Sequence, residues 1–242
     1  MPGLDPLAIY RALRVVNPSP YMFLLDAGRR RDARGLVPER LVREEDGRIE
    51  MRPLAGTRPR GRNRDEDETH ARELLADPKE RAEHVMLVDL TRNDVGRVAR
   101  YGSVRVSELL TIERYSHVMH LVSHVEGALA PGRSRVGGAT GGLPARHRQR
   151  GAEGARDGDH RRTGACGPGP YAGCVGYFGL DGSLNTAITI RTVLVRGGMA
   201  YVQAGAGVVY DSVPEREQEE CVAKARALMA AIERAGRTGG RP

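Results

Sequence analysis

Two stretches of the sequence each carry a pair of glutamates whose spacing would place both carboxylates on one face of a helix. Glu80 and Glu83 lie three residues apart, Glu217 and Glu220 repeat that spacing, and Lys224 follows four residues later. Side chains three and four residues apart are neighbours on a helix. Such carboxylates could exchange a proton or bind a cation, although an isolated pair of this kind is more often a solvated face with surface ion pairs. The spacing selects these residues without assigning their chemistry.

A histidine and a glycine-rich stretch are the other candidates for chemistry. His120 lies in the apolar run HVMHLVS and could act as an acid or a base, although a strand histidine is more often only hydrogen-bonded. Gly205 and Gly207 would let backbone N–H groups approach a carboxylate, although AGAG is more often a tight turn of a strand. His117, three residues before His120, has no comparable support.

The elements that must position these residues form a mixed pattern of helices and strands. Asp5 and Asp77, each followed by proline, predict the starts of two helices, and Asp46-Gly47 predicts a hairpin turn. The remaining pattern predicts helices over 68–76 and 214–235, and strands over 21–26, 85–90, 117–127, 171–182, 185–195 and 199–210. Strands and helices mixed in this order, with hairpins, predict an α+β fold.

Composition narrows the class of protein. The 242 residues suffice for a substantial core, and no apolar run reaches membrane-spanning length. The three cysteines are scattered without metal-ligand spacing, and such cysteine usage suits a reducing cytoplasm. The formal charge of +7 comes from two patches without aromatic residues: 29–37 carries +3, 133–167 carries +5, and the remainder sums to −1. Nucleic-acid binders usually interleave aromatics with basic residues, so we expect no nucleic-acid or membrane partner. A non-catalytic basic binding protein is the alternative from another class.

Seven blocks of the sequence occur in the order found in one family. They are VVNPSPYMF (15–23), PLAGTRPRG (53–61), DPKERAEHVMLVDLTRND (77–94), ERYSHVMHLVS (113–123), GPYAGCVGYFG (169–179), TAITIRT (186–192) and YVQAGAGVVYDSVPEREQEECVAKA (201–225). In these blocks the chain resembles the chorismate-utilising enzymes, most closely the large subunit of anthranilate synthase. The resemblance implies a partial chorismate-binding-enzyme fold, an α/β sandwich of mainly antiparallel sheets with flanking helices.

The resemblance also implies an activity. It is that of a cytoplasmic, Mg²⁺-dependent enzyme that adds ammonia to chorismate and eliminates pyruvate to give anthranilate. A glutamine amidotransferase subunit is the implied partner, because it would supply the ammonia.

Roles for individual residues follow from the same resemblance. Glu83 and Glu220 are the implied Mg²⁺ ligands, while Glu80 and Glu217 would act through water or as acid/base groups. Chorismate is a dianion, which two carboxylate-bearing faces would repel unless a hard cation lay between them. His120 would help the ring hydroxyl to leave or handle a proton during elimination. The implied substrate contacts are Gly56, Thr57, Tyr171, Arg191, Gly205, Gly207 and Lys224.

One position helps to choose within the family. Related aminodeoxychorismate synthases tend to carry a nucleophilic lysine where this chain has Ala55, so Ala55 favours anthranilate as the product. Aminodeoxychorismate synthesis and isochorismate or salicylate synthesis are the alternatives among enzymes.

Two departures from the family pattern lead to a further expectation. The chain begins late, so the N-terminal half with its feedback tryptophan site is expected to be absent, and a P-G-T-x-S-G-A-P-K segment is missing before GPYAG. Codons for Arg146–Gly154, read one base later, can encode G-T-V-S-G-A-P-K, and a similar shift from Arg30 gives a strand and turn. We therefore expect 29–37 and about 133–168 to be out of frame and disordered. They would interrupt a truncated catalytic domain over 1–235, followed by a tail over 236–242, and its activity is left open.

Overall fold

The computed structural model describes residues 5–16, 18–19, 21–26, 32–37, 40–115, 118–132, 169–206 and 212–238. His117, Gly207 and the segment 133–168 lie outside the described residues. The chain divides into two compact units, each of which is described by itself. Unit 1 comprises 1–38, 165–175 and 187–242, and unit 2 comprises 39–164 and 176–186.

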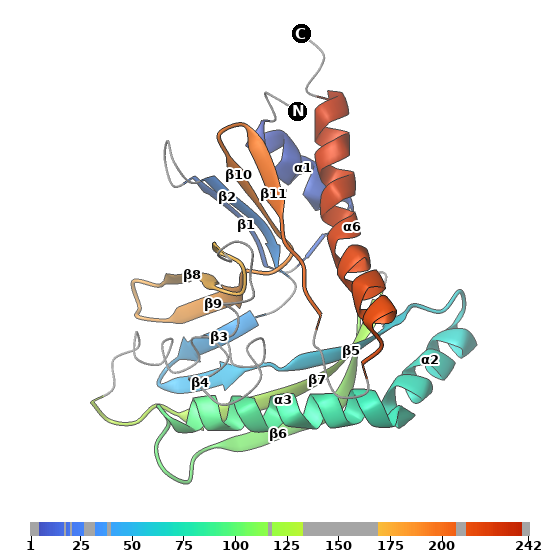
Figure 1. Ribbon diagram of the computed structural model, residues 1–242. Coiled ribbons are helices and arrows are strands. Elements are labelled where there is room, and N and C mark those ends of the chain that lie inside the picture. The colour runs from blue at the N-terminus through green and yellow to red at the C-terminus, as the bar shows by residue number, and fades with distance from the viewer. Residues whose placement is uncertain are drawn as a thin grey trace. The chain divides into compact units, whose positions relative to one another are not determined.

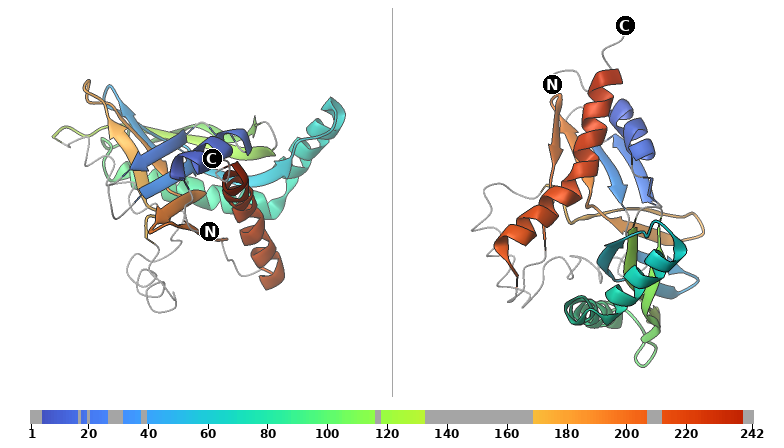
Figure 2. Two further views of the ribbon diagram at one scale, coloured as in Figure 1. Left: turned by 90° about the horizontal axis from the view of Figure 1, so that it is seen from above. Right: turned by 90° about the vertical axis from the view of Figure 1, so that its right-hand side faces the viewer.

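Unit 1 is built on a four-stranded antiparallel sheet. Its strand order is β1 (Tyr21–Asp26), β2 (Asp32–Val37), β10 (Thr192–Arg196) and β11 (Met199–Val202). Two helices, α1 (Pro6–Val16) and α6 (Pro214–Thr238), pack side by side against one face of this sheet (Figures 1 and 2). The core between them consists of Ile9, Ala12, Leu13, Val193, Val195, Leu228, Ala231 and Ala235.

The ends of these elements test several sequence predictions. The Asp5 carboxylate accepts hydrogen bonds from Leu7 N at 2.9 Å and Ala8 N at 3.2 Å, which confirms the predicted N-cap of α1. The terminal helix α6 extends three residues beyond the predicted 235. The predicted strand over 21–26 forms, with its first half partly exposed and its second half exposed.

Strand β2 differs from the expectation of disorder over 29–37. Its backbone pairs with β1 from Asp32 to Val37 and with β10 from Asp32 to Gly35. A strand ladder is formed by main-chain groups, so it does not require an alternating pattern of apolar side chains. The expectation of disorder is therefore wrong for 32–37, whereas the origin of the segment stays a prediction.

A second sheet has seven strands. Its order is β5 (Leu54–Pro59), β7 (Val118–Ala128), β4 (Arg48–Met51), β3 (Arg40–Glu45), β9 (Leu184–Ile188) and β8 (Cys174–Phe178), while β6 (Arg105–Arg114) pairs with β7. The long strand β7 is central, because β6 lies along one edge while β5 and β4 share the other. Asp46 and Gly47 have φ values of 51° and 75°, which confirms the predicted hairpin turn between β3 and β4.

Two helices of unit 2 pack on this sheet. They are α2 (Arg64–Ala76), which Asn63 caps, and α3 (Pro78–Gly96), which Asp77 caps. Figure 1 shows α3 running along the sheet of β6 and β7. The buried side chains Ala71 and Leu74 of α2 contact Met119 and Leu121 of β7. No helix in the described part of the chain is long and apolar enough to cross a membrane.

The predicted strand over 85–90 is wrong, because these residues continue α3. The buried residues of this helix are His84, Leu87, Val88, Thr91, Asp94 and Val95, which recur with helical spacing. A short, mostly apolar run does not by itself distinguish a strand from a buried helix. The strand predicted over 185–195 is likewise divided into β9 and β10 at 189–191.

Candidate active site

A β-bulge in β5 brings three of the predicted site residues together in unit 2. Ala55 pairs with Leu121 and Thr57 with His120, so Gly56 is an extra residue in the ladder. Its φ is +62°, a conformation that glycine adopts without strain. The bulge places the Gly56 carbonyl oxygen 3.0 Å from His120 Nδ1, and Thr57 Oγ1 lies 3.0 Å from the same nitrogen.

These contacts favour one tautomer of the His120 ring. A carbonyl oxygen can only accept a hydrogen bond, so the Gly56 contact favours a proton on Nδ1 and leaves the lone pair of the neutral ring on Nε2. The ring is 4% exposed, and the edge of Tyr115 packs near it with ring centroids 5.6 Å apart. The Gly56 contact thus places the lone pair of the neutral His120 ring on Nε2.

Glu80 lies beside the same bulge. A Cβ atom added to Gly56 would stand 3.3 Å from Glu80 Oε2, so the glycine leaves room for this carboxylate. Glu80 Oε1 faces the Arg58 guanidinium at 3.4 Å. Burial raises the pKa of the Glu80 carboxyl, Arg58 opposes this, and the negative charge of Glu83 adds to it. Gly56, Thr57, Glu80 and His120 therefore form one cluster, and Glu83 acts on Glu80 electrostatically.

The second group of predicted residues lies in unit 1. Lys224 Nζ is 2.5 Å from Glu220 Oε1, and it donates a hydrogen bond of 3.1 Å to the Gly205 carbonyl oxygen. A Cβ atom on Gly205 would stand 3.2 Å from the Tyr171 hydroxyl oxygen, so this glycine allows the hydroxyl to approach. The structure thus gathers Tyr171, Gly205, Glu220 and Lys224.

Two further predicted residues of unit 1 have unusual local geometry. Arg191 has a φ of +50°, which is uncommon for a residue with a long side chain and is found more often at binding sites. Glu217 Oε2 is buried and has no hydrogen-bond partner among the described residues. Gly207, also predicted to contact substrate, falls in a segment that is not described.

The donor chemistry of both units suits a hard cation. Among the residues described, no three His, Cys, Asp or Glu side chains form a group that could hold a metal ion. Mg²⁺ needs fewer than three protein ligands, because it commonly takes one or two carboxylates and completes its coordination shell with water and substrate oxygens. The buried Glu217 oxygen without a partner is consistent with a group that would satisfy it.

Sequence reasoning missed two features of the site. Arg58 lies in a quoted block, yet only the structure reveals its contacts with Asp77 and Glu80. The second feature is His84. Its Nε2 lies 2.7 Å from the Ser123 hydroxyl oxygen, and this contact joins α3 to β7. Burial lowers the pKa of His84 to about 4, so the ring is neutral at physiological pH.

Curated proteins share the sequence of this chain over most of its length. The anthranilate synthase component 1 of Acetivibrio thermocellus is 53% identical to the chain over 232 residues, which are 96% of this chain and 47% of that protein. The corresponding protein of Thermus thermophilus is 52% identical over 96% of this chain and 50% of its own length. The chain therefore spans about half the length of the curated relatives it matches.

A solved structure and a family model give the same result. The crystal structure of anthranilate synthase component I from Streptococcus pneumoniae TIGR4 superposes with a TM-score of 0.82 at 39% identity, covering 93% of this chain and 49% of that one. This likeness confirms the predicted α+β fold of antiparallel sheets with flanking helices. The chorismate binding enzyme model matches 1–140 and 165–230, and thus leaves uncovered most of the segment expected to be out of frame. The chain belongs to the chorismate binding enzyme family.

Proposed function

We propose that the chain carries the chemistry of an anthranilate synthase large subunit. Ammonia would add to chorismate, the ring hydroxyl would leave, and elimination of pyruvate would give anthranilate. The observation that carries this proposal is the Gly56 bulge, which holds His120 Nδ1 at 3.0 Å from a carbonyl oxygen beside Glu80. The identity of about 50% to anthranilate synthase components supports the choice of reaction.

The residues of unit 2 would handle protons. His120 would accept or return a proton at Nε2, since Nδ1 is engaged by the Gly56 carbonyl oxygen. The raised pKa of Glu80 suits a group that exchanges protons nearer neutrality than an exposed glutamate does. Ala55 offers no nucleophile, which favours direct amination over a covalent intermediate.

The residues of unit 1 would bind the carboxylates of the substrate. Lys224 and Arg191 supply positive charge, and the Tyr171 hydroxyl next to Gly205 supplies a donor. Gly207 belongs to the same proposed set. Lys224 is paired with Glu220 in the structure, so an incoming carboxylate would compete for this ammonium group.

We further propose Glu83 and Glu220 as ligands of Mg²⁺, with Glu80 and Glu217 acting through water or as acid/base groups. The family resemblance and the carboxylate donors support this assignment, and the ion would provide positive charge for a substrate carboxylate. A glutamine amidotransferase subunit is the proposed source of ammonia. We place the reaction in the cytoplasm, as the resemblance implies.

The proposal is tested with the purified chain, chorismate, MgCl₂ and an ammonium salt. We expect anthranilate, identified by chromatography and followed by its fluorescence. His120→Asn should lower kcat roughly a hundredfold or more, because the amide can still donate to Gly56 but offers nothing at the Nε2 position. His70→Asn is the matched control, since His70 Nδ1 also lies 3.0 Å from a backbone carbonyl, that of Pro59, and no catalytic role is proposed for it.

Three results would contradict the proposal. One is a different product, such as isochorismate, salicylate or aminodeoxychorismate. Another is a His120→Asn variant as active as the His70→Asn control. The third is an isothermal titration in which the folded chain binds neither chorismate nor Mg²⁺.

A further inference from the structure

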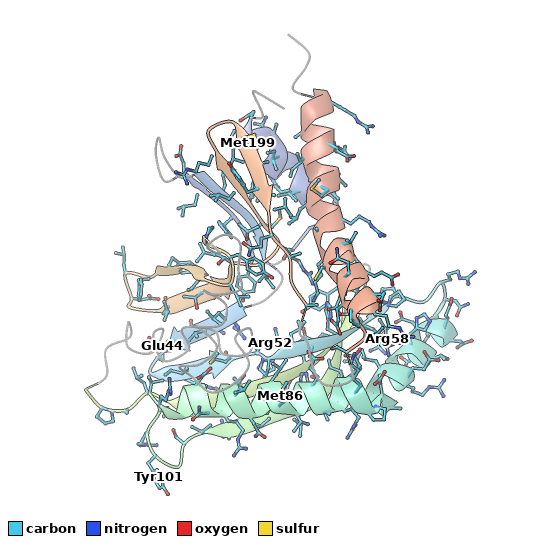
Figure 3. The ribbon with its side chains drawn as sticks, viewed as in Figure 1. Glu44, Arg52, Arg58, Met86, Tyr101 and Met199 are labelled. Atoms are coloured by element: carbon cyan, nitrogen blue, oxygen red, sulfur yellow. The ribbon has the colours of Figure 1, made fainter. Side chains whose placement is uncertain are left out.

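Arg58 makes more contacts than an ordinary surface arginine. Its Nη2 lies 2.9 Å from Asp77 Oδ2, and its Nη1 lies 3.4 Å from Glu80 Oε1 and donates to the Thr57 carbonyl oxygen at 3.0 Å. The side chain is only 27% exposed. One guanidinium thus joins strand β5 to the first turn of α3. Figure 3 labels Arg58 among the side chains of this part of the chain.

Its two carboxylate partners differ in how firmly they are held. Asp77 Oδ1 already accepts the backbone N–H groups of Lys79 and Glu80, so Asp77 is fixed as the helix cap. Glu80 has no such bond to the backbone in the described hydrogen bonds, and its Oε2 faces Gly56 while Oε1 faces Arg58. Arg58 therefore sets the orientation of Glu80 from a fixed cap.

The charge balance at this end of α3 also depends on Arg58. Asp77, Glu80 and Glu83 place three acids in its cap and first two turns, and Glu80 lies beside Gly56. Such a cluster attracts cations and repels anions unless a positive charge compensates it. Arg58 is the cation that contacts both Asp77 and Glu80.

We infer that Arg58 is a positioning residue that holds Glu80 and balances the acids of α3, so that an anionic substrate and a divalent cation can both bind there. This inference rests on the proposed function, because it takes chorismate and Mg²⁺ as the ligands. It predicts changes of opposite sign in the affinities for the cation and for the anion. Removal of the positive charge should strengthen cation binding and weaken anion binding, whereas loss of a merely structural contact would weaken both.

The experiment measures two affinities by isothermal titration of the full chain, with MgCl₂ alone and with chorismate in the presence of saturating MgCl₂. Arg58→Gln removes the charge but keeps a hydrogen-bond donor. We expect its Kd for Mg²⁺ to fall about two- to tenfold and its Kd for chorismate to rise by a similar factor. Arg58→Lys restores the charge and should return both constants to within about twofold of the unmodified chain.

Arg92→Gln is the matched control. Arg92 pairs with Asp89 on the same helix, at 3.0 Å, and both side chains are more than half exposed. This variant loses the same charge away from the bulge, and both constants should stay unchanged.

The outcomes separate the inference from the proposed function. If the unmodified chain binds neither ligand, the proposed function falls and this inference falls with it. If it binds both, the inference is overturned when Arg58→Gln weakens both affinities together or leaves both unchanged. Should Arg58→Gln fail to fold, Arg58→Lys decides. If it keeps its affinity for both ligands, the role of the positive charge is supported, and if it loses affinity for both, the inference is overturned.

Discussion

At the residue scale, Gly56 combines two constraints that only glycine satisfies. Its φ of +62° costs a side-chain-bearing residue about 1 kcal/mol. A Cβ atom there would also lie 2.9 Å from Leu74 Cδ1 and 3.3 Å from Glu80 Oε2. The same residue thus permits the bulge that orients His120 and leaves space for the neighbouring carboxylate.

Gly56→Ala should therefore lower the free energy of unfolding by roughly 2–4 kcal/mol, the cost of positive φ plus that of overpacking. The matched control is Gly102→Ala, because Gly102 has a φ of +76° but open space around its Cβ position. It should cost about 1 kcal/mol. Urea unfolding of both variants gives the difference, and equal losses would show that packing around Gly56 is loose.

The candidate site illustrates what single residues in a sequence can and cannot reveal. Motif order selected Gly56, Thr57, Glu80 and His120, and the structure gathers them around one bulge. Arg58 was missed because its role depends on how far β5 lies from the first turn of α3, which no local pattern states. Spacing within one element is readable from sequence, whereas distance between elements is set by packing.

At the element scale, α3, β6 and β7 meet at one buried serine. Ser123 is 0% exposed, and its hydroxyl oxygen lies 2.7 Å from His84 Nε2 and accepts the backbone N–H of Leu110 at 3.0 Å. Leu110 has a φ of +54°, a strained value for leucine, at an irregular point of β6. This hydroxyl therefore ties the helix that carries Glu80 to the strand that carries His120.

We expect Ser123→Ala to reduce the free energy of unfolding by roughly 2–4 kcal/mol, because it leaves the buried His84 ring and the half-buried N–H of Leu110 without their partner. The control is Ser107→Ala at an exposed position of β6, which should change stability by less than about 0.5 kcal/mol. Chemical denaturation measures both. A Ser123→Ala variant as stable as the control would mean that His84 and Leu110 find other partners.

Elements with a strong local start signal were predicted, and those decided by packing were not. The cap Asp5 and the turn Asp46-Gly47 are local chemistry, and both form as expected. The run 85–90 was assigned to a strand because it is short and mostly apolar, but α3 has no breaker between Pro78 at its start and Gly96 at its end. Likewise, β2 is a strand because its main chain pairs with β1 and β10, and its side-chain pattern does not predict this pairing.

At the scale of the whole molecule, stability should depend on pH through a buried acid near the end of α3. Asp94 is 2% exposed, and burial raises its pKa from the ordinary 3.8 to about 7, against the opposing charge of Arg97. The unfolded chain then releases this proton at lower pH than the folded chain does. The contribution of Asp94 is fully favourable below about pH 4 and is lost as the pH rises through 7.

Asp94→Asn should remove this dependence, because the amide does not ionise. We expect the difference in unfolding free energy between the variant and the unmodified chain to shift in favour of asparagine by roughly 2–4 kcal/mol from pH 4 to pH 8. Asp89→Asn on the same helix, at a side chain that is 64% exposed, is the control and should show no comparable trend. Urea unfolding across this pH range provides the measurement. A difference that stays constant with pH would mean that Asp94 is ionised in the folded chain, and that a compensating charge rather than a proton satisfies it.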